Sequence, residues 1–182
     1  MLEKVIQGLR YSFKYDKSVL RRYTILGAFD GILLATGILI SSSAVKILPQ
    51  DIFLSVTSGI IAIAISSTWN ALVVEAKERE KEFKDLERQM MRKLDGTIYE
   101  YGMKSTIVLS ALLHGASPFL GLIPILVYTY TRSVMLGVGT SLASLFVLGV
   151  LYEGDLKEKL ISGVIIFIAG VVTVLITALI SR

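Results

Sequence analysis

Five apolar stretches, each long enough to cross a lipid bilayer, restrict this chain to a helical membrane bundle. A bilayer core requires about 20 apolar residues per helix, and each stretch has roughly 19 to 25. The chain is 53% hydrophobic and 19% charged, with a mean hydropathy of +0.68. A soluble domain of this length rarely reaches such values. We therefore expect an all-α integral membrane protein with five transmembrane helices, over approximately 23–45, 52–74, 106–130, 133–151 and 160–180.

Basic residues are distributed unequally over the two sides of such a bundle. If the chain crosses five times, sixteen of the 19 Lys and Arg residues fall in the N-terminal segment and in the second and fourth connections. Only Lys46, Arg132 and Arg182 fall on the other side. Cytoplasmic loops carry the excess of Lys and Arg, so we expect a cytoplasmic N-terminus and an external C-terminus. The net charge of +4 then indicates contact with anionic membrane lipid and no nucleic-acid partner.

The same pattern divides the chain into four parts. Residues 1–22 carry Leu2, Val5 and Ile6 at helical spacing between basic residues, and this predicts a cytoplasmic amphipathic helix at the membrane surface. Residues 23–74 form the first two spans. Residues 75–104 form an acidic cytoplasmic segment, expected to begin as a long helix that extends from the second span. Residues 105–182 form the last three spans.

Asp30 is the only acidic residue in the first apolar stretch. A carboxylate within a membrane costs several kcal/mol and by default marks an ion or proton pathway. Small residues recur every fourth position beside it, at Gly27, Gly31 and Ala35, and predict a face for close helix packing or dimerisation. The alternative is that Asp30 only forms a hydrogen bond with a neighbour in such a packing seam.

Polar residues at helical spacing also occur on later spans. Ser66 and Asn70 lie on one side of the second, and His114, the only histidine, lies on the third between Ser110 and Ser117. Together with Asp30, we assign Ser66, Asn70 and His114 to a translocation path. Helix packing explains the serines equally well, and a lone histidine often only bonds across helices. Pro118 and Pro124 are expected to interrupt the third helix.

Carboxylates and methionines are concentrated in the acidic segment. Clustered at helical spacing, such side chains can hold a divalent ion, with sulfur favouring softer metals. A solvated helix with internal ion pairs, such as Glu80 with Lys84 and Glu75 with Arg79, is the alternative. The candidate ligands, with Asp30, are Glu75, Glu78, Glu82, Asp85, Met90 and Met91.

The order of these features resembles the vacuolar iron transporter family. The resemblance rests on Asp30-Gly31, the stretch 64–66, the glutamate-rich segment, Met90-Met91 and the region 118–124. It implies a homodimeric five-helix carrier that exports ferrous iron or manganese from the cytosol. Asp30 would lie on the path at the dimer axis, and the acidic segment would capture metal. The chain departs from the family pattern at Gly59, Ser67 and residues 93–94, and its acidic segment is short, which indicates a divergent branch in the cell membrane of a prokaryote.

In this interpretation divalent ions and protons are the partners of the carrier, with no tightly bound cofactor. The competing hypothesis is a membrane scaffold that does not transport and binds a partner through an apolar stripe at Phe83, Leu86, Met90 and Leu94. An enzyme is the least expected class, because the chain has one histidine, no cysteine and no arrangement of nucleophile, base and acid.

Overall fold

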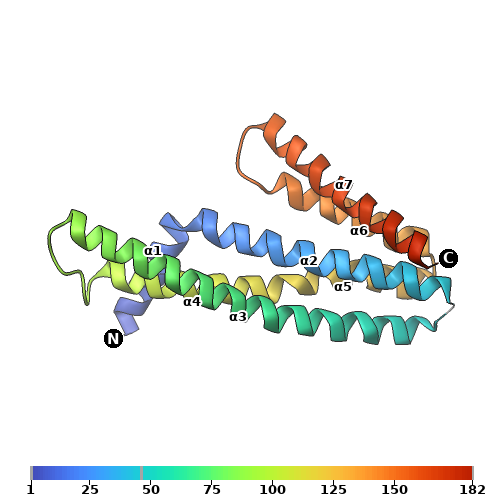
Figure 1. The fold of residues 1–182 in the computed structure, drawn as a ribbon, viewed down its shortest axis with the longest axis horizontal. Coiled ribbons are helices and arrows are strands. Elements are labelled where there is room, and N and C mark those ends of the chain that lie inside the picture. The colour runs from blue at the N-terminus through green and yellow to red at the C-terminus, as the bar shows by residue number, and fades with distance from the viewer. Residues whose placement is uncertain (1, 46, 182) are drawn as a thin grey trace.

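The computed structural model describes residues 2–45 and 47–181, and the described residues contain helices and no strands. The polypeptide runs back and forth along one long axis, so that its two ends lie at opposite ends of the molecule (Figure 1). The elements are α1 Leu2–Tyr15, α2 Lys17–Ala44, α3 Pro49–Gln89, α4 Ile98–Ala116, the 3-10 turn η1 Ser117–Gly121, α5 Leu122–Thr131, α6 Val134–Val150 and α7 Leu156–Ile180.

Four segments are long and apolar enough to cross a membrane: α2, α3, the α4–η1–α5 unit and α7. These agree with four of the five predicted spans. The remaining one, α6, is apolar but has only 17 residues, which corresponds to about 25 Å of helix. It is thus shorter than the usual membrane span, and it pairs with α7 in a hairpin (Figure 1).

The helix α2 is the centre of the bundle, because it packs against every other helix. Ala35 and Leu39 on one side of α2 meet Ile52 and Val56 of α3 and Ile125 of α5 in a fully buried cluster. A second cluster joins α2 to α6 through Ala28, Ile32 and Leu145. The span that carries Asp30 is therefore held from several sides, and the position of this carboxylate is fixed by the core.

The α-helix of the third span is interrupted at Pro118, as predicted, whereas Pro124 lies inside α5 and does not interrupt it. The α-helical backbone ends at Ala116, continues as a 3-10 turn with Pro118 at its start, and resumes at Leu122. Proline lacks an amide hydrogen and so cannot continue the α-helical ladder. The turn lies against α2, where Gly31 and Gly121 allow backbone to meet backbone.

The three segments predicted to share the cytoplasmic side are linked by contacts between their side chains and backbone. The Lys4 ammonium donates to the carbonyl of Gly96 in the second connection, at 3.4 Å. Arg21 at the start of α2 forms an ion pair with Glu153 in the fourth connection. These contacts join the N-terminal segment to both of the other basic segments. The helix α3 runs unbroken from the membrane into the second connection, which confirms that a long helix extends from the second span.

Candidate functional site

A polar groove opens between α2 and α3, with one wall completed by α4. Its volume is about 470 Å³. The lining includes all four residues assigned from sequence to a translocation path, namely Asp30, Ser66, Asn70 and His114. Ser67 and three apolar side chains, Leu33, Leu34 and Ile63, complete it. The structure thus brings together residues from three helices that are separated by as many as 84 positions in the sequence.

Asp30 lies midway along α2 and is exposed in this groove. Leu33 and Leu34 follow one turn later and form its apolar wall. A carboxylate exposed at this depth of a single membrane-spanning chain would face hydrocarbon, at a cost of several kcal/mol. The groove therefore needs water, an ion or a second protein surface beside it.

The small-residue face of α2 lies next to the groove, on the side of the helix that faces α4 and η1. Gly27 packs against His114 and Ser117, and Gly31 packs against Pro118. Ala35 is fully buried among α3 and α5 residues. The close packing predicted from these residues is therefore present, but the chain's own helices supply the partner. This face is filled and does not present a surface to a second copy.

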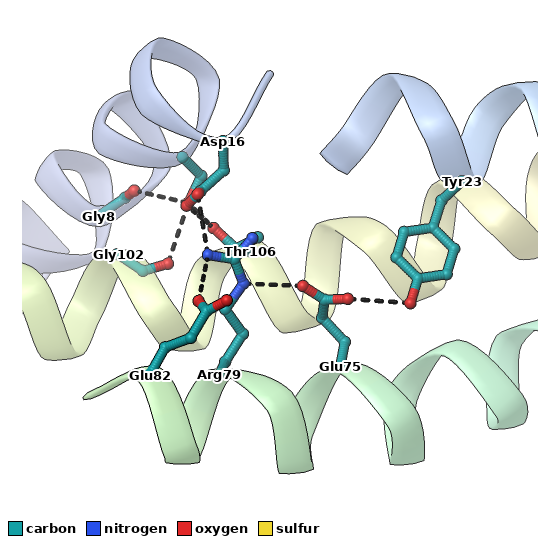
Figure 2. Close-up of polar contacts among 9 residues, drawn as sticks. Gly8, Asp16, Tyr23, Glu75, Arg79, Glu82, Gly102 and Thr106 are labelled. Atoms are coloured by element: carbon teal, nitrogen blue, oxygen red, sulfur yellow. Dashed lines mark hydrogen bonds and ion pairs between the residues drawn. The ribbon is translucent and has the colours of Figure 1, made fainter. Parts of the chain in front are cut away.

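A second polar cluster lies where α1, α2, α3 and α4 meet (Figure 2). Its hub is Arg79, whose Nε donates to Glu75 at 2.8 Å and whose terminal nitrogen donates to Asp16 and to Glu82, each at 3.0 Å. The Tyr23 hydroxyl donates to the other oxygen of Glu75 at 2.9 Å. The Thr106 hydroxyl donates to Asp16 at 2.7 Å.

The predicted metal ligands of the acidic segment form ion pairs or remain exposed, and the arginine-centred network holds two of them. Glu75 is only 1% exposed, so it is a structural carboxylate inside the bundle. Glu82 forms an ion pair with Arg79, and Asp85 forms one with Arg88 at 3.2 Å. Within residues 2–45 and 47–181, no three His, Cys, Asp or Glu side chains lie close enough to hold a metal ion. Glu78 is exposed, and Met91 at the end of the helix is 94% exposed.

The alternative of internal ion pairs describes this helix better. Glu75 binds Arg79 and Lys84 binds Glu80, at 2.8 and 2.6 Å, as their spacing predicts. The apolar stripe proposed as a scaffold surface is also partly occupied. Leu94 is completely buried, and Phe83 and Leu86 line a pocket shared with Tyr99 and Met103 of α4. Met90 remains exposed.

Sequence reasoning missed Asp16, Arg79 and Tyr23 as members of one site. Asp16 lies at the break between α1 and α2, and its link to Arg79 spans 63 positions. The sequence indicated only one contact of this network, the ion pair expected from the spacing of Glu75 and Arg79. The spacing did not indicate that Glu75 is buried.

Comparison with known proteins gives one distant relative. The chain is 26% identical over 166 residues to the uncharacterized protein MJ0645 of Methanocaldococcus jannaschii, covering 85% of this chain and 84% of the relative. No protein-family model matches the chain. No solved structure matches it either. The similarity extends over most of both chains, and the apolar helices of this chain indicate a membrane location.

Proposed function

We propose that this protein is a proton-coupled carrier of divalent metal ions, ferrous iron or manganese, that exports them from the cytosol. The observation that supports this most is the position of Asp30, an exposed carboxylate midway along a membrane-spanning helix, in a groove with Ser66, Asn70 and His114. Charged groups in such positions mark ion and proton pathways. The resemblance noted from the sequence supplies the direction and the metals.

A second copy of the chain would close the groove. The exposed side of α3 beside it carries small and polar residues, Ser55, Ser58, Ala62, Ser66 and Asn70, where lipid would favour apolar ones. Small and polar residues are typical of helix–helix contacts in membranes. In this proposal the dimer contact forms across α3 and the mouth of the groove, not across the small-residue face of α2.

The transport step follows from competition at one site. A partly dehydrated divalent ion binds between the Asp30 carboxylates of the two copies, where two like charges favour a divalent cation. Paired carboxylates titrate as a unit and share protons readily. Protons that enter from outside neutralise the pair and release the ion. Each cycle thereby exchanges metal for protons.

The test is flux of Fe²⁺ and Mn²⁺ into proteoliposomes under an imposed proton gradient. Asp30→Asn keeps the shape of the side chain and removes its charge, and it should lower flux by roughly tenfold or more. Asp51→Asn, at the exposed first turn of α3, is the matched control and should leave flux unchanged. Equal flux in wild type and Asp30→Asn would refute the central role of Asp30. No flux of any divalent ion in folded protein would refute the carrier.

A further inference from the structure

His114 has no hydrogen-bond partner for either ring nitrogen within the described residues. The residue is 8% exposed, and Ser110, one turn earlier on α4, has an equally unpartnered and fully buried hydroxyl. A buried polar group without a partner costs about 1 to 3 kcal/mol. Such groups are rare, and each one calls for a physical explanation, among them an ion that binds there.

The imidazole also lies at the wall of the Asp30 groove. Asp30 contributes a carboxylate from α2, Ser66 and Asn70 contribute oxygens from α3, and His114 approaches from α4. Residues that carry the two kinds of cation ligand, oxygen and nitrogen, thus line one space of about 470 Å³, although both nitrogens of His114 are buried in the wall. Three separate helices supply them, so the juxtaposition does not arise from spacing along one helix.

The surroundings hold the imidazole without using its nitrogens. The ring of Tyr23 packs beside it, with ring centroids 5.2 Å apart and planes inclined by 51°. The tyrosine hydroxyl donates its hydrogen bond to Glu75 and not to the imidazole. On another side, Gly27 has no side chain to fill the space next to the ring carbon. The ring is therefore packed against Tyr23 and Gly27, and neither ring nitrogen makes a hydrogen bond within the described residues.

We propose that His114 is a nitrogen ligand for the transported ion, which passes between it and Asp30. A turn of the ring about its χ2 bond, a soft torsion, presents a nitrogen to the groove. The neutral imidazole would contribute no charge, so the carboxylate of Asp30 still governs exchange with protons. This inference rests on the proposed carrier function and specifies its substrate class.

A mixed nitrogen and oxygen site discriminates among divalent cations. Imidazole suits first-row transition metals such as Fe²⁺, Co²⁺ and Zn²⁺, whereas Mg²⁺ and Ca²⁺ bind oxygen ligands almost entirely. The chain has no cysteine, so a softer ligand than imidazole in the groove could come only from methionine. None of its methionines lines the groove. His114 is thus the residue that would make the carrier favour transition metals.

Because His114 is the only histidine, its coordination can be read directly. The full-length protein is prepared with natural-abundance or ¹⁵N-labelled histidine, reconstituted in lipid and loaded with Mn²⁺, and pulsed EPR then detects nitrogen coupled to the metal. We expect a ¹⁴N coupling that becomes a ¹⁵N coupling with labelled histidine and vanishes in His114→Gln. Bound Mn²⁺ that shows no nitrogen coupling would overturn the inference and leave the carrier intact.

Flux measurements give a second, independent readout. In wild type, excess Mg²⁺ or Ca²⁺ should leave Fe²⁺ flux nearly unchanged, while Co²⁺ and Zn²⁺ should inhibit it. In His114→Gln, Fe²⁺ flux should fall by roughly tenfold and Mg²⁺ should begin to compete. Ser141→Val is the control, since Ser141 is equally buried but its hydroxyl bonds the Gly137 carbonyl on α6. Unchanged selectivity in a folded His114→Gln variant would exclude a ligand role. Absence of any Asp30-dependent flux would refute the carrier and this inference together.

Discussion

Gly31 of α2 and Pro118 of the 3-10 turn η1 are in backbone contact: a methyl group added to Gly31 would overlap the carbonyl of Pro118. On the neighbouring turn, a methyl group on Gly121 would overlap the carbonyl of Gly31. The 3-10 turn of the third span and the glycine of the first therefore form one close backbone contact, on the residue next to Asp30.

Gly31→Ala should destabilise the protein by about 1 to 3 kcal/mol, because the overlapping atoms belong to backbone and cannot rotate away. The measurement is thermal unfolding in detergent, followed by circular dichroism. Gly139→Ala on α6 is the matched control. A methyl group there meets nothing within 4 Å, so alanine should be neutral or slightly stabilising in the helix. Equal unfolding temperatures for the two variants would contradict the close contact.

The Arg79 network should be essential for the stability of the region where α1, α2, α3 and α4 meet. Arg79→Ala leaves the buried Glu75 and the half-buried Asp16 without their cation, and breaking a buried pair costs about 3 to 5 kcal/mol. Arg79→Lys should retain only part of the stabilising free energy. One ammonium cannot reproduce the planar guanidinium group, which bonds three carboxylates.

The control for this network is Lys84→Ala, because the pair of Lys84 with Glu80 is exposed on both sides. It should change the unfolding temperature little, as is usual for surface ion pairs. If Arg79→Ala unfolds at the temperature of Lys84→Ala, the buried network contributes nothing.

Tyr23 and Glu75 should be energetically coupled. Tyr23→Phe removes a hydrogen bond to a charged acceptor, which is worth about 1.5 to 3 kcal/mol. Glu75→Gln weakens the same contact from the other side, so the double variant should lose less than the sum of the two single changes. A double-mutant cycle on unfolding free energies measures this coupling. Strict additivity would show that the bond does not stabilise the fold.

The sequence pattern was sufficient to predict the helices that crossing a bilayer requires. Four long apolar helices, the interruption of the α-helix at Pro118 and the continuous helix through 49–89 follow from local rules of length, hydropathy and proline chemistry. The grouping of Asp30, Ser66, Asn70 and His114 also followed, because each was a polar exception on an apolar helix.

The contacts that a residue makes with other helices were harder to predict than its place on its own helix. The small face of α2 was predicted to serve helix packing or a dimer; η1 and α4 of the same chain fill it at Gly27 and Gly31, and no periodicity distinguishes the two kinds of partner. Glu75 was assigned to metal capture, yet the arginine one turn along the helix neutralises it inside the bundle. Both outcomes depend on contacts between residues far apart in sequence. A single helix pattern carries no information about them.

The turn after α3 should open in acid. The Leu94 amide donates to Glu87 at 2.9 Å, and this bond, together with Lys93 nearby, holds the pKa of Glu87 below its usual 4.5. A lowered pKa in the folded state means that the stabilisation is complete above 4.5 and is lost as the pH falls through the lower value. The turn closes over Leu94, which is fully buried, so protonation should loosen the end of α3 first.

Amide hydrogen exchange at Leu94, corrected for the intrinsic rate at each pH, measures this opening. Protection should be constant from neutral pH down to about 4.5 and then decline as Glu87 takes up its proton. In Glu87→Gln, protection should be lower at neutral pH and independent of pH, because the amide oxygen still accepts a bond but has no charge. The amide of Ile60, in the core of α3, is the internal reference and should not change. Acid loss of protection that persists in Glu87→Gln would assign the opening to another group.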